Sequence, residues 1–294
     1  MYSFNIGMKT KKIVIYLFII TTIILTIYLA IELYSTPCGK CNKKYRENFS
    51  DESKRIFMTF GTKDRFKKSL VRIKNEAESM QVFDDYYVYN EDDLKSDAEF
   101  WNKHGKFIES NPRGYGYWIW KSYLILKTLR MMKDGDILLY CDSGSTLRPN
   151  GRPKLLEYME HCVQSKTGIF CFQLEVNHEK QWTKMDLLDK MDMHNQYYLD
   201  SIQIAATNII FCKRAESIQF VEKWHELCVS DNYMYVTDEP SKSQNDQFFV
   251  EHRHDQSIFS LSVKKDDGCF VLKTPDTEKE SDDSFPIYNS RIRE

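Results

Sequence analysis

The sequence has little net charge and few cysteines. Lys and Arg total 41 against 43 Asp and Glu, which gives a formal net charge of −2, whereas a dedicated nucleic-acid-binding protein normally carries a basic surplus. Eight cysteines in 294 residues are too sparse for a disulfide-stapled scaffold. The mean hydropathy of −0.53 excludes a polytopic membrane protein. With 42% hydrophobic residues, however, the chain has enough apolar side chains for a sizeable core, and we expect no nucleic-acid partner.

Three common functional motifs are also absent. The sequence contains no G-x-G-x-x-G and no G-x-x-x-x-G-K-[ST], so neither a dinucleotide fold nor a P-loop has support. It contains no G-x-S-x-G, which disfavours a serine hydrolase. No internal repeat is visible either.

One long segment is far more apolar than the sequence as a whole. Ile13 to Ile31 carries no charge and spans roughly 28 Å as a helix, close to the hydrocarbon thickness of a bilayer. A cleaved signal peptide and a buried core helix are the alternatives. A signal peptide usually has a shorter apolar region, and no small-x-small cleavage site follows this one. We therefore predict an uncleaved membrane anchor over residues 13–33.

Basic residues flank the segment on both sides, and the nearer cluster precedes it. They are Lys9, Lys11 and Lys12 before the segment and Lys40, Lys43, Lys44 and Arg46 after it. Because positive residues favour the cytoplasmic side, we expect a type II protein. Residues 1–12 form a short cytoplasmic tail, 34–53 a stem, and the rest lies on the lumenal or other non-cytoplasmic side.

From Lys54 the sequence alternates between short apolar runs and helical patterns. This alternation predicts an α/β domain over residues 54–272, with a mostly parallel sheet and helices on both faces. The polar residues 273–294 are predicted to be a disordered tail. The expected strands are 55–60, 82–89, 136–142, 168–174 and 202–212, and the expected helices are 64–79, 94–108, 117–132, 153–164, 182–191, 215–228 and 255–264.

Asp142 is the first candidate site residue. It is the last residue of the most apolar predicted strand, 136–142, and ligands of open α/β sheets bind beyond the carboxyl ends of the strands. A carboxylate there can hold Mg²⁺ or Mn²⁺. The alternative is an Asx turn that caps the strand.

Two further clusters combine charge with special backbone or ring chemistry. Asp255 is a good N-cap at the start of the helix from Gln256 to Lys264, and His252 and His254 precede it on one face of an extended segment. In R-G-Y-G-Y-W-I-W-K, the glycines allow a ligand to approach the backbone, and Arg113 and Lys121 supply positive charge. The alternative for the first cluster is a helix-capping Asp255 with two histidines whose hydrogen bonds are made within the chain. The alternative for the second is an aromatic core helix with ordinary surface cations.

Together these segments resemble a known group of enzymes. The segments T-F-G-T, G-Y-G-Y-W-I-W-K, G-D-I-L-L-Y-C-D-S-G and H-R-H-D-Q-S-I-F-S-L resemble GT-A fold (nucleotide-diphospho-sugar) glycosyltransferases, in particular putative capsular and surface-polysaccharide glycosyltransferases. The resemblance covers roughly residues 54–272. It implies a GT-A-like sheet and a membrane-anchored enzyme that transfers a sugar from a nucleotide-sugar donor to a glycan, lipid or protein acceptor.

The resemblance also implies roles for individual residues. Asp142 takes the place of the Asp-x-Asp metal motif, but Gly144 replaces its second acid. The resemblance therefore implies Mn²⁺ or Mg²⁺ held through waters by Asp142 together with His254 or Asp255. Asp255 is implied as the catalytic base. The implied donor-binding residues are Thr59, Gly61, Thr62, Arg113, Lys121, Asp142 and Ser143. Whether the reaction retains or inverts the sugar linkage stays open.

Two other functions compete with this interpretation. An inactive GT-A-like protein that binds carbohydrate or acts as a scaffold is favoured by the missing second acid. A phosphatase with Asp142 as nucleophile is disfavoured, because that chemistry wants an acid two residues later, where Gly144 stands.

Overall fold

The computed structural model describes residues 53–292, which lie within one compact unit of the chain. Within this range, no helix has the length and apolar character needed to cross a membrane. The predicted tail 1–12, anchor 13–33 and almost all of the stem 34–53 lie outside the described residues, so those predictions stay untested.

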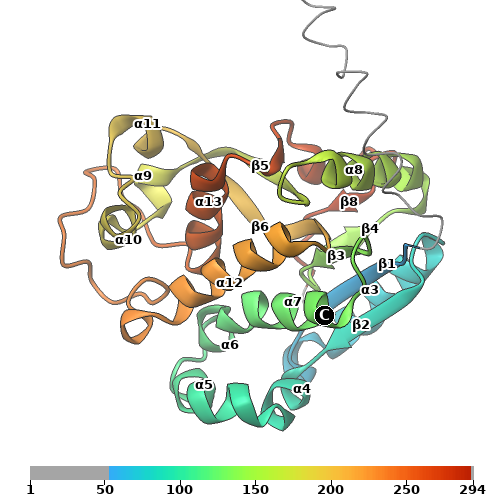
Figure 1. The fold of residues 1–294 in the computed structure, drawn as a ribbon, viewed down its shortest axis with the longest axis horizontal. Coiled ribbons are helices and arrows are strands. Elements are labelled where there is room, and N and C mark those ends of the chain that lie inside the picture. Colours follow the sequence, from blue (N-terminus) through green and yellow to red (C-terminus); the bar gives the residue numbers. More distant parts are fainter. Residues whose placement is uncertain (1–52, 293–294) are drawn as a thin grey trace, which may run out of the picture. The chain divides into compact units, whose positions relative to one another are not determined.

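A six-stranded sheet forms the centre of the unit, with the order β2-β1-β3-β6-β5-β7 (Figure 1). β1 pairs in parallel with β2 and β3, and β5 pairs in parallel with β7. β6 is antiparallel to both of its neighbours, β3 and β5, so the other five strands share one direction. The predicted α/β class with a mostly parallel sheet is therefore confirmed. The strands are β1 Arg55–Phe60, β2 Asp85–Tyr89, β3 Ile137–Cys141, β5 Ile169–His178, β6 Ile202–Cys212 and β7 Phe270–Leu272.

Helices cover both faces of the sheet, as predicted (Figure 1). Ile56 and Met58 of β1 belong to one buried cluster with residues of α5, α7, α12 and α13. Because side chains alternate along a strand, the intervening residues face the other way. There Tyr158 of α8 stacks on Phe170 of β5 at 4.9 Å between ring centroids. The helices are α3 Lys63–Ser79, α4 Glu91–Ser96, α5 Ala98–Ser110, α6 Gly114–Tyr117, α7 Ile119–Met131, α8 Arg152–Gln164, α9 Glu179–Trp182, α10 Met185–Lys190, α11 Gln196–Leu199, α12 Ala215–Val229 and α13 Asp255–Asp266.

Three helices predicted as continuous are interrupted. Residues 94–108 divide at Asp97, whose carboxylate accepts hydrogen bonds from Tyr123 and Lys127 and caps α5 at the amide of Phe100. Residues 182–191 divide between α9 and α10. The third, 117–132, begins with a left-handed turn, because every residue from 114 to 118 has a positive φ of 52–85°.

Gly116 makes this left-handed turn possible. Its φ is +85°, and a Cβ there would lie 2.6 Å from Ile108 Cγ1 of α5. We expect Gly116→Ala to lower the free energy of unfolding by about 2–3 kcal/mol, from backbone strain together with overpacking. Gly135→Ala is the matched control, since Gly135 has a φ of +91° but its Cβ would meet only Ser53 Oγ, at 3.2 Å. Equal losses in urea unfolding of the two variants would contradict the role given to the α5 contact.

The prediction of a disordered tail is wrong for residues 273–292. β8 (Ile287–Tyr288) pairs antiparallel with β4 (Thr146–Leu147). The Ile292 amide then donates to Gly144 O at 3.1 Å. The polar composition of the tail indicated disorder, but this pairing and these long-range hydrogen bonds order it. The end of the described chain therefore lies on the loop that follows Asp142.

Candidate functional site

The carboxyl ends of β1 and β3 form the edge where the sequence places a ligand. β2 and β3 lie on opposite sides of β1, so the chain order reverses there, and ligands of open α/β sheets bind at such a point. Asp142 follows β3, and Thr59 lies near the end of β1. Thr59 Oγ1 is fully buried and has no hydrogen-bond partner among the described residues.

Gly61 and Ser143 connect these two strand ends. A Cβ on Gly61 would lie 3.1 Å from Ser143 Oγ and 2.8 Å from Phe66 Cβ. A side chain at position 61 would therefore push the loops after β1 and β3 apart. The structure brings these two predicted residues together.

Lys121, Asp142 and Asp255 form the centre of the candidate site. Lys121 extends from α7, Asp142 follows β3, and Asp255 is the first residue of α13. Lys121 Nζ lies 3.2 Å from Asp142 Oδ1 and 3.1 Å from Asp255 Oδ2, and it donates to Ala206 O at 3.1 Å. Tyr140 OH donates to Asp142 Oδ1 at 2.5 Å. Three predicted site residues, far apart in the sequence, thus meet through one ammonium group.

Burial sets the electrostatics of this cluster. Burial raises the pKa of Asp255 to about 6, although Lys121 acts in the opposite direction. For Lys121, burial acts to lower the pKa, but Asp142 and Asp255 outweigh it, so the pKa is raised and the amine is protonated. Burial, followed by the nearby Asp142, raises the pKa of Tyr140 well above its usual value. At neutral pH the cluster therefore contains one cation, two carboxylates and a neutral phenol.

The raised pKa of Asp255 makes a contribution to stability that depends on pH. Between pH 4 and 6 the folded carboxyl binds a proton that the unfolded one has lost, so stability falls as the pH rises through this window. We expect the free energy of unfolding of the wild type, relative to Asp255→Asn, to fall by up to about 1.4 kcal/mol per pH unit there. Above about pH 6 the difference should be constant. Urea unfolding from pH 4 to 8 tests this, and a difference that rises with pH would contradict it.

The three charged residues differ in access to solvent. The side chains of Lys121 and Asp255 are 4% and 5% exposed, whereas that of Asp142 is 34% exposed. Asp142 is therefore the member that a ligand can reach. Three oxygens of the chain, from Ala206, Asp142 and Asp255, lie within 3.2 Å of Lys121 Nζ. Lys121 is therefore not free to contact a diphosphate in this arrangement, and Asp255 is not free to contact an acceptor, as the resemblance had implied.

His254 and Arg113 lie beside this cluster rather than in it. His254 has φ 55° and ψ −126°, a rare conformation for a non-glycine residue, and strained residues of this kind concentrate at functional sites. Its ring lies 5.0 and 5.3 Å from those of Tyr117 and Trp118, and burial lowers its pKa to about 4. Its Nε2 is buried, forms no hydrogen bond with residues 53–292, and lies 3.7 Å from Asp238 Oδ1.

Arg113 forms ion pairs with two carboxylates near His254. Its Nη1 lies 3.0 Å from Asp238 Oδ2 and its Nη2 lies 3.3 Å from Glu251 Oε2. All of these side chains are roughly 40% exposed. The positive charge predicted to meet a diphosphate is therefore compensated within the chain.

Thr62 is the predicted residue with the least evident role. It is the N-cap of α3, yet its side chain makes no capping hydrogen bond. The amide of Lys63 donates to the Glu91 carboxylate at 2.8 and 3.1 Å. A carboxylate of the chain therefore occupies the N-terminus of α3, where an anionic ligand would otherwise be favoured.

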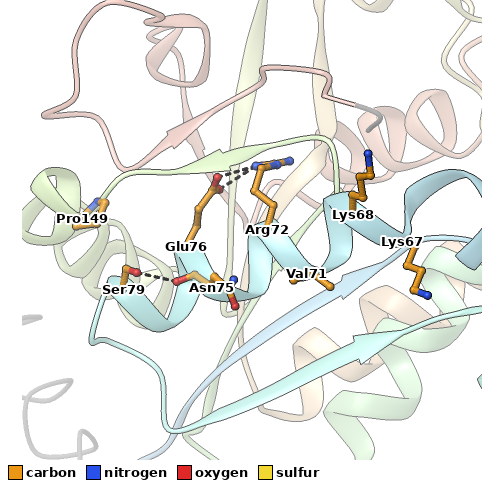
Figure 2. Close-up of a pocket in the computed structure, with 8 residues that line it drawn as sticks. All are labelled: Lys67, Lys68, Val71, Arg72, Asn75, Glu76, Ser79 and Pro149. Carbon is orange, nitrogen blue, oxygen red and sulfur yellow. Dashed lines mark hydrogen bonds and ion pairs between the residues drawn. The ribbon is translucent and has the colours of Figure 1, made fainter.

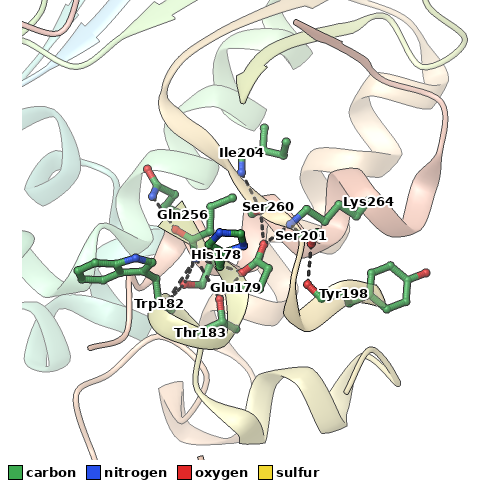
Figure 3. A network of polar contacts seen from close by, with 12 residues as sticks. His178, Glu179, Trp182, Thr183, Tyr198, Ser201, Ile204, Gln256, Ser260 and Lys264 are labelled. Atoms are coloured by element: carbon green, nitrogen blue, oxygen red, sulfur yellow. Dashed lines mark hydrogen bonds and ion pairs between the residues drawn. The ribbon is translucent and has the colours of Figure 1, made fainter. Parts of the chain in front are cut away.

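A buried polar network around Glu179 was not predicted (Figure 3). Glu179 of α9 is fully buried, and its carboxylate lies 2.6 Å from Lys264 Nζ and accepts from Ser260 Oγ at 2.5 Å. Gln203 Nε2 of β6 donates to the same carboxylate at 3.1 Å. Gln256 Nε2 in turn donates to Gln203 Oε1 at 3.0 Å. The network therefore holds the first turn of α13, where Asp255 lies. No single motif signals it, because its members come from three elements.

We expect Glu179→Gln to lower the free energy of unfolding by about 2 kcal/mol. The amide keeps the shape but leaves the largely buried Lys264 ammonium without its anion. The double variant Glu179→Gln/Lys264→Met should recover most of the loss. A single variant as stable as wild type in urea unfolding would show that the charge pair adds nothing.

A separate open cavity of about 860 Å³ lies along α3 (Figure 2). None of the predicted site residues lines it. Arg72, at its border, donates to Ser143 O and Ser145 O, both at 2.9 Å. This side of α3 therefore supports the loop after Asp142. The residues that line the cavity are Lys67, Lys68, Val71, Arg72, Asn75, Glu76, Ser79 and Pro149.

The comparisons with known proteins give similar solved structures but no similar sequence or family. No family model matches the chain, and no curated protein sequence matches it. Among solved structures, the chain is similar to the apo form of mouse xyloside xylosyltransferase 1, with 11% identity and a TM-score of 0.38. The similarity covers 75% of this chain and 84% of that one. At this identity and TM-score, the likeness assigns the chain to no family.

Proposed function

We propose that this protein is a glycosyltransferase that moves a sugar from a nucleotide-sugar donor to a hydroxyl group of a glycan, lipid or protein acceptor. The observation that carries the proposal is the position of Asp142. It is the accessible carboxylate of a buried charged cluster, at the point of the sheet where the strand order reverses. The motifs that resemble GT-A glycosyltransferases contribute each of the three charged residues of this cluster.

The charge of the cluster decides which part of the donor meets Asp142. Asp142, Asp255 and Lys121 together carry −1, so an anionic diphosphate in direct contact with Asp142 would be repelled. A sugar hydroxyl, in contrast, donates a hydrogen bond to a carboxylate. Tyr140 and Lys121 both face Asp142 Oδ1, and Oδ2 makes no hydrogen bond to residues 53–292. In our proposal, Oδ2 therefore accepts a hydrogen bond from a substrate hydroxyl.

The reaction sets the remaining requirements. The bond between the anomeric carbon and the diphosphate oxygen breaks, and a bond from that carbon to the acceptor oxygen forms. The hydroxyl proton must pass to a base, and cations must stabilise the leaving diphosphate. In our proposal Asp255 holds Lys121 in place. Its role as the base stays a prediction from the sequence.

We also propose that residues 13–33 anchor the enzyme in a membrane as a type II protein. The uncharged segment from Ile13 to Ile31 supports the anchor, and the nearer basic cluster supports the orientation. The described domain then lies on the lumenal or other non-cytoplasmic side, where surface polysaccharides or glycoconjugates are assembled.

A screen of nucleotide sugars tests the proposed activity. The full chain is incubated with UDP-, GDP- and CMP-sugars, and release of the nucleotide is measured with and without an acceptor mixture. We expect turnover of one nucleotide class. The absence of turnover with every donor would contradict the proposal.

One observation favours a second function, a catalytically inactive protein that binds carbohydrate. Three oxygens of the chain already surround Lys121 Nζ within 3.2 Å. Gly144 also stands where the second acid of a metal motif would be. Saturable binding of a sugar or nucleotide sugar without turnover would favour this function.

A further inference from the structure

A divalent metal has no suitable set of ligands at the candidate site. The resemblance implies Mn²⁺ or Mg²⁺ held by Asp142 and His254, and such ions take about six ligands, mostly oxygen, at roughly 2.0–2.2 Å. Among the described residues, no three His, Cys, Asp or Glu side chains are grouped to hold a metal ion. His254 Nδ1 forms a hydrogen bond with Val236 O at 2.8 Å, and its Nε2 lies 3.7 Å from Asp238 Oδ1. His254 therefore directs neither ring nitrogen to Asp142.

The position between the two carboxylates is already occupied. Lys121 Nζ lies 3.2 Å from Asp142 Oδ1 and 3.1 Å from Asp255 Oδ2, with Ala206 O as a third oxygen at 3.1 Å. The ammonium thus has three oxygen neighbours from three separate elements, as a bound cation would. The side chain of Lys121 is only 4% exposed, so this position is closed to solvent. A metal ion could take this position between the two carboxylates only if the ammonium left.

Charge balance points the same way. Without Lys121 the two carboxylates would carry −2, which a divalent ion would neutralise. With the ammonium present they carry −1, and adding a divalent ion would leave a net charge of +1 in a largely buried place. Bringing two cations together within a low-dielectric region is costly.

We propose that the ammonium group of Lys121 is the built-in cation of this site and replaces a divalent metal there. Wild-type protein then binds no divalent metal at Asp142, and removing the ammonium converts Asp142 and Asp255 into a metal site. The part of this inference that concerns activity rests on the proposed glycosyltransferase function. The part that concerns metal binding does not.

Binding of Mn²⁺ alone tests the inference on the full chain, with free Mn²⁺ measured by electron paramagnetic resonance. For wild type, we expect binding no greater than that of Asp142→Asn. Lys121→Ser should gain one saturable Mn²⁺ site and a melting temperature that rises with Mn²⁺, because the ion binds only the folded state. Both gains should disappear in Lys121→Ser/Asp142→Asn.

Lys127→Ser is the matched control. Lys127 is also on α7, and its Nζ lies 2.6 Å from one carboxylate, that of Asp97. Because only one carboxylate is freed, we expect no new Mn²⁺ site.

Two results would overturn the inference. One is a Mn²⁺ site in wild type that Asp142→Asn removes, and this comparison decides the question even if Lys121→Ser fails to fold. The other is a folded Lys121→Ser variant that gains no site. If the donor screen finds turnover, that turnover should persist in excess EDTA, and its loss would also overturn the inference. If no donor turns over, the proposed function fails while the Mn²⁺ measurements still stand.

Discussion

Replacing Asp142 with asparagine is expected to lower the rate of sugar transfer at least a hundredfold while the fold is kept. Asparagine has the same shape and can still accept a hydrogen bond from Tyr140. It lacks the negative charge of the carboxylate. That charge strengthens the hydrogen bond from a substrate hydroxyl, and it stabilises the positive charge that the sugar acquires in the transition state. A hundredfold loss in kcat/KM corresponds to about 2.7 kcal/mol of transition-state stabilisation.

The measurement is kcat/KM for the donor that the screen identifies, with circular dichroism and melting curves to confirm folding. Asp134→Asn is the matched control. Asp134 lies in the turn before β3, at its opposite end, and its side chain is 81% exposed in an ion pair with Lys213. It should retain wild-type activity. Full activity in Asp142→Asn would remove Asp142 from the reaction.

Replacing Lys121 with methionine is expected to lower the free energy of unfolding by about 4 kcal/mol. Methionine fills similar space but leaves Asp142 and the buried Asp255 without their shared cation. Breaking a buried ion pair on one side typically costs 3–5 kcal/mol, because a charge remains buried and unpaired. Urea unfolding of the full chain at pH 7 measures the loss.

Two comparisons make this result specific. Lys127→Met removes a cation from the same helix, but its side chain is 38% exposed, so its loss should stay near 1 kcal/mol. Lys121→Met/Asp255→Asn removes the buried charge as well and should recover part of the stability. If Lys121→Met were as stable as wild type, the cluster would not be the electrostatic centre described above.

The sequence predicts the strands that carry the site better than the contacts that form it. The predicted strand 55–60 has the bounds of β1, and the predicted strand 136–142 exceeds β3 by one residue at each end, so Asp142 lies just after the strand rather than in it. The meeting of Lys121 with Asp142 and Asp255 did not follow from the pattern, because the three residues come from α7, the end of β3 and α13. The spacing of these three residues along the sequence does not show how far apart they lie in the folded protein.

The interrupted helices and the tail were mispredicted for related reasons. The hydrophobic period continues through Asp97 and Trp118, so it cannot show that a carboxylate cap or a left-handed turn breaks the helix there. The tail has the composition of a disordered segment, and it is ordered by residues far away in the sequence. In each case a tertiary contact overrides the local pattern.

The pairing of β8 with β4 affects how the protein is made. Ser290 Oγ and the amide of Ile292 both donate to the carbonyl of Gly144, across about half of the chain. During synthesis on the ribosome, the loop after Asp142 emerges long before these partners exist. The upstream strands can pair as they appear, but this loop is held in its final conformation only when the last described residues have been translated. A ribosome that stops early would release a chain with most of its sheet, in which Arg72 still contacts the loop after Asp142 but the pairing of β8 with β4 is missing.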